Sequence, residues 1–193
     1  DWVAKQDHRV AYDWMQKMLK VLQYQQTPKT WILKTPQHLE YMDVIAEQFP
    51  TATIINTHRN PKECIPSFCS MIYHSRKMFS KEVDPLEVAN HWVNKNIYML
   101  HNTIRARQNN LHLKVIDVYY TDLVKDPIGT VQKIYEQIGR PWNDRIVTEL
   151  KQATTRNKKD KYGKHHYDKA DFGLTDAGIE EQFDFYMDYA KLK

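Results

Sequence analysis

Apolar residues recur along the chain with two different spacings, which predict helices and short strands in alternation. Steps of three and four positions predict helices over residues 5–26, 37–49, 84–108, 128–138, 142–155 and 175–191. The first of these helices has its predicted core face at Trp14, Met18, Val21 and Leu22. Three shorter runs of bulky apolar or β-branched residues predict strands at 31–33, 52–56 and 113–118.

Capping residues mark the start of three helices. Each start pairs a capping Asn or Asp with a proline at the first helical position, at Asn60-Pro61, Asp84-Pro85 and Asp126-Pro127. Glu63 stands where a capping box places its acid, and Pro66 is expected to kink the helix or restart it. A restart brings Ser67 close to a helix amino terminus. Residues 156–173 are expected to form a basic loop.

Strands that alternate with long helices are typical of the α/β class, in which helices flank a parallel sheet. Ligands of such sheets bind at the carboxyl ends of the strands. The segments that follow Leu33, Asn56 and Val118 are therefore the places where a site is expected.

The composition fits one globular domain and excludes several classes of protein. The chain has 193 residues, of which 41% are apolar and 27% charged, so disorder is excluded. No run comes near the roughly 18 apolar residues of a membrane span. Lys and Arg number 28 against 24 acidic residues, and this net charge of +4 suits an anionic ligand but is too small to indicate a nucleic acid.

Cysteines and glycines are few. Cys64 and Cys69 form no disulfide framework and no zinc pattern, and they are interpreted as buried thiols. The compartment stays open, with a reducing one such as the cytoplasm favoured. None of the five glycines precedes Gly129, which excludes a glycine-rich phosphate loop in the first two-thirds of the chain. The chain also opens at Asp1, directly in helical periodicity, and is expected to be a partial segment.

The end of the first predicted strand carries a cation and a base. Lys34 follows the strand directly, and His38 lies four residues later, in the first turn of the next predicted helix. A lysine can stabilise an anionic group during its transfer, and a histidine is a base with a pKa near neutral pH. A solvated lysine and a helix-capping histidine explain the same pattern equally well.

The residues at the end of the second predicted strand are typical of a phosphate site. Arg59 stands there, and a restarted helix places free backbone amides and Ser67 beside it. The alternative is a structural salt bridge for Arg59 and a Ser67 that merely fills a helix turn.

The third strand end and the late loop carry weaker signals. Tyr120 can stack on a base, although tyrosines at such positions also pack in cores. The basic loop, with Lys161 in it, can close over an anion or remain solvated. His165 and His166 lack an acidic or cysteine partner at ligand spacing, so no metal site is predicted.

Together these segments resemble the sulfotransferases that use 3′-phosphoadenosine 5′-phosphosulfate (PAPS), in the branch common in bacteria and unicellular organisms. Residues 31–39 are similar to the Trp-x-Leu-Lys-x-Pro-x-His-Leu segment of that branch. Residues 49–50 and 57–61 are similar to its Phe-Pro and Thr-His-Arg-[Asn/Asp]-Pro segments. Arg59 and Ser67, eight positions apart, match the 3′-phosphate motif.

Two later matches extend the resemblance. Tyr120 precedes a Leu-x-x-Asp-Pro segment, as the family's adenine-side tyrosine does, and Lys161-Tyr162-Gly163 matches a late phosphate contact. One departure concerns the base, because the better-known cytosolic branch has its histidine two residues after the lysine, where this chain has Pro36.

The resemblance implies a single sulfotransferase-like domain over residues 1–193, related to P-loop NTPases and incomplete at its N-terminus. The family's strand–loop–helix for the 5′-phosphosulfate is absent, so an unpaired strand edge, or pairing with a missing segment or another chain, is expected. The implied reaction moves a sulfuryl group from PAPS, without a metal, to a hydroxyl or amine of a small molecule, glycan or peptide.

The resemblance also implies a role for each candidate residue. Lys34 stabilises developing charge and His38 takes the acceptor's proton. The residues that hold the nucleotide are Arg59, Ser67, Lys161 and Gly163 at the 3′-phosphate and Tyr120 at the adenine.

Two alternatives remain open. The first is a non-catalytic fragment or pseudoenzyme that binds 3′-phosphorylated nucleotides. The second is an α/β interaction module whose basic loop binds an acidic partner, in a salt-sensitive manner.

Overall fold

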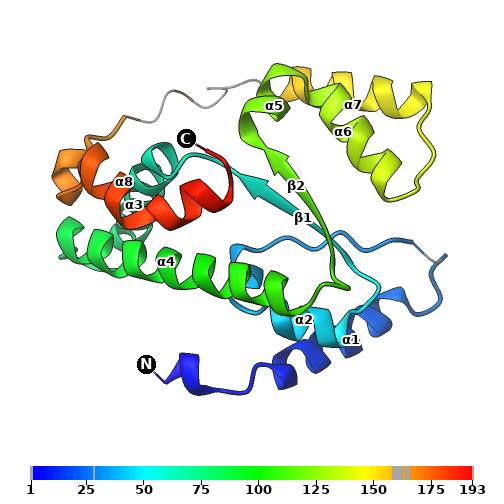
Figure 1. The fold of residues 1–193 in the computed structure, drawn as a ribbon, viewed down its shortest axis with the longest axis horizontal. Helices are drawn as coiled ribbons and strands as arrows, with labels where there is room; N and C mark the ends of the chain where they lie inside the picture. The colour runs from blue at the N-terminus through cyan, green and yellow to red at the C-terminus, as the bar shows by residue number, and fades with distance from the viewer. Residues whose placement is uncertain (1, 28, 158–162, 164–165, 193) are drawn as a thin grey trace. The chain divides into compact units, whose positions relative to one another are not determined.

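The chain divides into two compact units. A computed structural model describes residues 2–27, 29–157, 163 and 166–192 (Figure 1). The helical unit comprises Asp1–Ala52 with Tyr98–Lys114, and the sheet unit comprises Thr53–Ile97 with Val115–Lys193. The long helix α4, Pro85–Asn109, contributes residues to both units.

The helical unit packs short helices around a small apolar core. Its elements are η1 (Val3–Lys5), α1 (Arg9–Gln23), η2 (Pro36–Glu40), α2 (Met42–Gln48) and the second half of α4. α1 packs against α2. The buried side chains include Tyr12, Met42, Ile45, Ala46 and Met99. The buried Thr103 hydroxyl of α4 donates to the Leu39 carbonyl at 2.6 Å, which ties η2 to this core.

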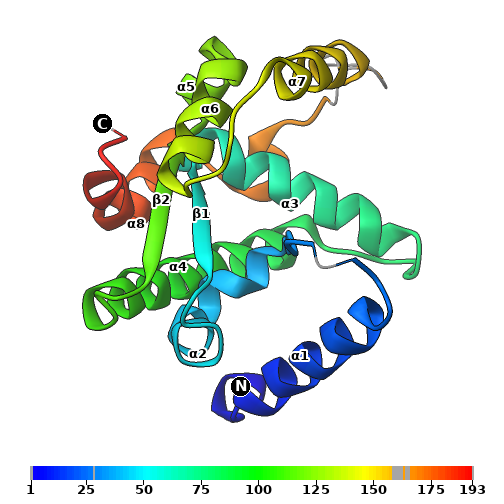
Figure 2. The same cartoon turned by 90° about the vertical axis from the view of Figure 1, so that its right-hand side faces the viewer.

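The sheet unit is built on β1 (Thr53–His58) and β2 (Lys114–Tyr119), which lie side by side as a two-stranded parallel sheet (Figure 2). Its other elements are α3 (Pro61–Lys77), the first half of α4, α5 (Tyr120–Lys125), α6 (Pro127–Gln137), α7 (Asp144–Arg156), η3 (Lys169–Phe172) and α8 (Asp176–Tyr189). α3 packs against α8 and η3. The core between these elements includes Cys69, Val88, Ile116, Ile179 and Phe183.

The structure confirms the α/β class, the parallel sheet and the three capped helix starts. The Asn60 side chain accepts from the Lys62 amide at 2.9 Å, and the Asp84 side chain accepts from Leu86 at 2.8 Å. Asp126 does the same for Gly129 at 2.9 Å. No helix among the described residues is both long and apolar enough to cross a lipid bilayer.

The strand predicted at residues 31–33 is wrong. The segment is not hydrogen-bonded into the sheet, which among the described residues consists of β1 and β2. Its side chains are exposed, with Ile32 at 90%. An apolar run becomes a strand only where a neighbouring strand can pair with it, and none of the described residues supplies that partner.

The predicted core face of α1 is also wrong. Trp14 is 60% exposed and the other three residues of that face are exposed as well, whereas Tyr12 is 7% exposed. The packed face carries Tyr12, together with the Gln16 amide that donates to the Gln48 carbonyl at 2.6 Å. Both faces of this helix carry large apolar residues, so periodicity identifies the helix without identifying the face that packs.

The restart expected at Pro66 does not occur, because α3 runs without a break through Pro66. Pro66 leaves the Lys62 carbonyl without its usual intrahelical donor. The neighbouring residues Ile65 and Cys69 are buried, and α3 packs against α8 and η3. This packing holds the helix in spite of one missing hydrogen bond.

The predicted basic loop, residues 156–173, ends in a short helical element that the sequence did not predict. η3 begins after Asp168, whose side chain accepts from the Ala170 amide at 2.9 Å. The element ends at Gly173, which has a φ of 64° that favours glycine.

Candidate functional site

Arg59 lies between the end of β1 and the start of α3, with a side chain that is 42% exposed. Its Nε donates to the Glu63 carboxylate at 2.9 Å. Its guanidinium carbon lies 4.2 Å from the centroid of the Tyr120 ring. Within the described part of the chain its two terminal nitrogens form no hydrogen bond, so a planar pair of donors is left for an anion.

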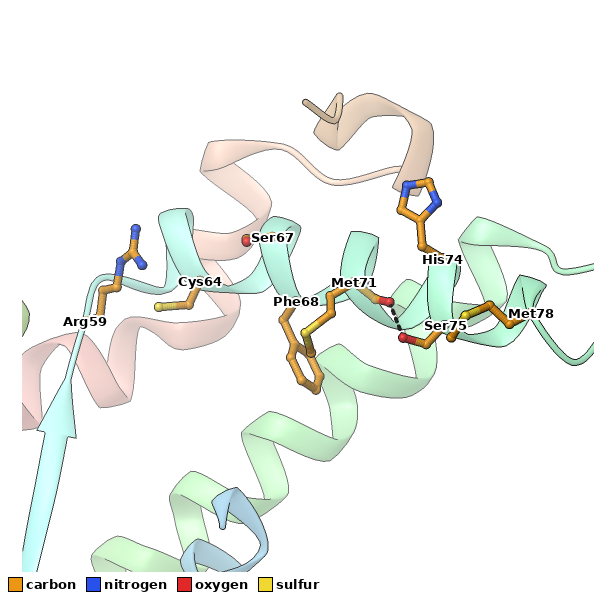
Figure 3. Close-up of a pocket in the computed structure, with 8 residues that line it drawn as sticks. All are labelled: Arg59, Cys64, Ser67, Phe68, Met71, His74, Ser75 and Met78. Carbon is orange, nitrogen blue, oxygen red and sulfur yellow. Dashed lines mark hydrogen bonds between the residues drawn. The ribbon is translucent and has the colours of Figure 1, made fainter. Parts of the chain in front are cut away.

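Ser67 lies further along α3 and lines the same open pocket as Arg59. The pocket has a volume of about 830 Å³ and is lined by Arg59, Cys64, Ser67, Phe68, Met71, His74, Ser75 and Met78 (Figure 3). The half-buried Ser67 hydroxyl has no hydrogen-bond partner among the described residues. The Ser75 hydroxyl, by contrast, donates to the Met71 carbonyl at 2.9 Å. The pocket therefore has a polar end at Arg59 and Ser67, and its other lining residues are mostly apolar.

The free backbone amides expected beside Arg59 are not present. The Lys62 amide donates to the Asn60 side chain, and the amides of Glu63 and Cys64 donate to the Asn60 carbonyl at 3.0 and 3.1 Å. Because the helix does not restart at Pro66, no new set of amides opens at Ser67. The first turn of α3 and the turn at Ser67 therefore offer an anion no free amide at residues 62–64 or 67.

The thiol nearest to Arg59 is not an activated nucleophile. Burial raises the pKa of Cys64, and the attraction of the Arg59 charge does not overcome this effect. The thiol consequently stays protonated near neutral pH. Cys64 is half-buried and Cys69 fully buried, and both are free cysteines, as the sequence predicts.

Lys34 and His38 lie in the helical unit. Lys34 is exposed and, within the described residues, its ammonium has no hydrogen-bond or ion-pair partner. His38 is half-buried in η2, and its Nδ1 lies 2.8 Å from the Tyr12 hydroxyl. Burial lowers the pKa of His38 below its ordinary value, so the imidazole is neutral at pH 7. A neutral imidazole is the form that can accept a proton.

Tyr12 is a partner of His38 that sequence reasoning missed. Burial, with smaller contributions from Asp43 and Glu40, raises the pKa of Tyr12 to about 12, so its hydroxyl stays protonated. When His38 carries its proton on Nδ1, it donates to the Tyr12 oxygen and leaves the Nε2 lone pair free. The only sequence signal was a tyrosine on the less apolar face of α1.

The sequence also predicted a role for Glu63 that differs from the one in the structure. It stands at the capping-box position, but its carboxylate accepts from Arg59. A carboxylate four residues after an arginine is a common helical ion pair, and that signal was available in the sequence.

For the remaining candidate site residues the structure gives little information. Gly163 is exposed with a φ of 93°, whereas Lys161 and His165 lie outside the described residues. His166 is exposed. In the part of the chain that the structure describes, no group of three or more His, Cys, Asp or Glu residues is arranged to hold a metal ion.

The structure therefore brings together Arg59, Ser67 and Tyr120 in the sheet unit. Arg59 and Ser67 line one pocket, and the Tyr120 ring lies against Arg59. Lys34 and His38 belong to the helical unit, where His38 contacts Tyr12.

Comparison with known families identifies the class of protein. Residues 3–144 match the sequence profile described as the sulfotransferase family, so the chain belongs to this family. No curated protein gives a significant match.

Two solved structures share the fold. The chain is similar to sulfotransferase STF9 from Mycobacterium avium, with a TM-score of 0.85, 23% identity, and coverage of 97% of this chain and 48% of that one. It is also similar to sulfotransferase STF1 from Mycobacterium tuberculosis H37Rv, with a TM-score of 0.80, 30% identity, and coverage of 95% and 47%. The chain thus spans about half the length of these two proteins.

Proposed function

We propose that this chain is part of an enzyme that transfers a sulfuryl group from PAPS to an acceptor hydroxyl or amine. The observation that carries the proposal is the pairing of Arg59 and Ser67 in one pocket, at the spacing of the family's 3′-phosphate motif. Membership of the sulfotransferase family supports it. The acceptor is a small molecule, a glycan or a peptide.

The donors at the polar end of the pocket fit a phosphate group. The terminal nitrogens of Arg59 and the hydroxyl of Ser67 bind the 3′-phosphate. Glu63 and Tyr120 hold the guanidinium in place while its outer edge faces the ligand. The Tyr120 ring also flanks the adenine.

The residues proposed for the transfer step are Lys34 and His38. PAPS, when bound, supplies the activated sulfuryl group, and the protein contributes charge, orientation and a base. His38 accepts the proton of the acceptor at Nε2, with Nδ1–H donating to Tyr12. Lys34 stabilises negative charge that develops during transfer.

Titration calorimetry tests the binding half of this proposal. The chain should bind adenosine 3′,5′-bisphosphate more tightly than adenosine 5′-monophosphate. Charge-assisted hydrogen bonds contribute about 1.5–3 kcal/mol each, which is roughly 10- to 150-fold in affinity. Arg59→Ala should remove most of the difference.

Arg145→Ala is the matched control for Arg59→Ala. Arg145 pairs with Glu149 at the same spacing of four residues and the same 2.9 Å distance, on the exposed face of α7. This variant should leave the preference unchanged. Equal affinities of the unsubstituted chain for the two nucleotides contradict the proposal.

The transfer step is tested in an enzyme that carries these residues together with a 5′-phosphosulfate-binding loop. Lys34→Ala and His38→Ala should each lower turnover far more than nucleotide binding, by about 10²–10⁴-fold for loss of the general base. An unchanged rate and pH profile in His38→Ala means that the base lies elsewhere.

One observation favours a second candidate, a segment that binds the nucleotide without catalysis. No glycine precedes Gly129, so the first two-thirds of the chain have no glycine-rich loop for the 5′ side. The 193-residue chain alone should therefore have negligible transferase activity. Robust transfer from labelled PAPS to hydroxyl acceptors by this purified chain excludes the second candidate.

A further inference from the structure

His58 is a buried histidine that the proposed function does not use. It is the last residue of β1, it directly precedes Arg59, and it is 2% exposed. The His58 backbone is therefore joined by one peptide bond to Arg59, the residue proposed to bind the anion.

Both ring nitrogens of His58 have partners on other elements. Nε2 lies 2.8 Å from Oδ1 of Asp117 on β2, and Nδ1 lies 2.9 Å from the Tyr186 hydroxyl on α8. The ring also stacks against Tyr119 and Tyr186, with centroids 5.3 and 5.9 Å away. One side chain therefore joins both strands of the sheet to α8.

The partners determine where the protons lie. A carboxylate only accepts, so Nε2 carries the proton and donates to Asp117, and the Asn56 side-chain amide lies 3.3 Å from the same nitrogen. In the neutral imidazole, Nδ1 then accepts from the Tyr186 hydroxyl. Burial raises the pKa of Tyr186, so this hydroxyl remains a donor rather than becoming a reactive phenolate. This Asp–His–Tyr arrangement is therefore suited to holding elements together and not to nucleophilic chemistry.

A second tie to α8 lies on the other side of Arg59. Lys62, in the first turn of α3, pairs with Glu180 of α8 at 2.9 Å. Arg59 is thus held between two attachment points to the same helix, one buried at His58 and one exposed at Lys62.

We propose that His58 is a positioning residue for Arg59. By joining β1, β2 and α8 at the strand end, it holds the backbone from which the guanidinium reaches the pocket, and so sets selectivity for a 3′-phosphate. The inference rests on the proposed function for its ligand. The positioning role itself, in which His58 immobilises Arg59, does not depend on the identity of the ligand.

Three substitutions separate positioning from stability. His58→Phe keeps an aromatic ring between Tyr119 and Tyr186 but removes both hydrogen bonds. Tyr186→Phe removes only the hydroxyl, and His58→Gln restores one donor and one acceptor. The matched control is Tyr135→Phe, which removes a hydroxyl from α6 in the same unit, where the ring packs edge-on against Trp142.

The first readout is the ratio of affinities for adenosine 3′,5′-bisphosphate and adenosine 5′-monophosphate. His58→Phe and Tyr186→Phe should lower this ratio, on the order of tenfold for His58→Phe, because misplacing a binding group by about 1 Å is costly. His58→Gln should recover part of it, and Tyr135→Phe should not change it. Equal weakening of both nucleotides in His58→Phe and Tyr186→Phe overturns the proposal.

The second readout needs no nucleotide. The Nε–H of Arg59, bonded to Glu63, should give a resolved nitrogen-15 NMR signal in the unsubstituted chain that broadens or moves towards free arginine in Tyr186→Phe. An unchanged signal overturns the positioning role. If the unsubstituted chain shows no nucleotide preference while this signal responds, the proposed function fails and the positioning role stands. Should His58→Phe fail to fold, Tyr186→Phe alone decides both readouts.

Discussion

The guanidinium of Arg59 lies over the ring of Tyr120, with its central carbon 4.2 Å from the ring centroid. Arg59 directly follows β1 and Tyr120 directly follows β2. Because these strands are parallel neighbours, their carboxyl ends bring together two residues that are far apart in sequence.

This contact predicts a difference between two substitutions of Tyr120. Tyr120→Leu should weaken binding of adenosine 3′,5′-bisphosphate by roughly 2- to 5-fold, since an exposed cation–π contact contributes about 0.5–1 kcal/mol. Tyr120→Phe keeps the aromatic face and should bind like the unsubstituted chain. Calorimetry with the two variants measures this difference. Equal affinities of Tyr120→Leu and Tyr120→Phe for the bisphosphate would show that the ring face does not contribute to binding.

Glu63 should oppose anion binding through its charge. Glu63→Gln keeps an oxygen that can accept from Arg59 Nε but removes a negative charge 2.9 Å from the guanidinium. Because the pair is exposed, the gain in affinity for the bisphosphate should be modest, about 2- to 5-fold at low salt, and should shrink as salt is added.

The matched control for this variant is Glu149→Gln, which changes the equivalent pair with Arg145 on α7. It should leave the affinity unchanged. Weaker binding by Glu63→Gln would mean that the carboxylate serves mainly to orient Arg59.

Burial of His38 makes the stability of the chain depend on pH. Its pKa in the folded chain lies below the ordinary 6.5, so near and below pH 6.5 the unfolded chain binds more protons than the folded one. The His38 contribution to stability should therefore be constant well above pH 6.5 and should be lost as the pH falls below 6.5 through the lower pKa of the folded chain.

Urea denaturation from about pH 5 to pH 8 measures this dependence. His38→Gln should flatten the profile relative to the unsubstituted chain. His112→Gln, at an exposed histidine of the same unit, should not. Parallel profiles for His38→Gln and the unsubstituted chain would contradict the burial argument.

Thr103 should stabilise the segment that carries His38. Thr103→Val leaves the Leu39 carbonyl without its donor in a buried position and should lower the free energy of unfolding by about 1–3 kcal/mol. Thr103→Ser keeps the hydroxyl and should lose less. The control Thr148→Val, at an exposed hydroxyl that donates to the Asp144 carbonyl at 2.8 Å, should change it by less than about 0.5 kcal/mol.

Local signals explain what the sequence predicted correctly. Asn60, Asp84 and Asp126 cap helices within two or three residues of themselves, so nothing distant is needed to recognise them. Arg59 and Ser67 line one pocket because both lie on or beside one helix, whose geometry fixes their separation, whereas their role at a phosphate stays a prediction.

The misses depend on distant partners. The run at 31–33 has the composition of a strand, but pairing requires a neighbour that the described residues do not supply. The choice between the two faces of α1 depends on α2, which is encoded elsewhere. The partnership of His38 with Tyr12 joins residues 26 positions apart, and no local pattern encodes it.

The hydrogen bond between His58 and Tyr186 spans 128 positions of sequence. During synthesis, the end of β1 leaves the ribosome long before α8 exists, and at about 5–20 residues per second that interval lasts many seconds. Until then the imidazole that precedes Arg59 has no partner at Nδ1 on α8. Completion of the carboxyl end of the sheet is therefore a late event in biogenesis, and a ribosome that stalls before the codon for Tyr186 leaves a nascent chain in which His58 lacks this partner.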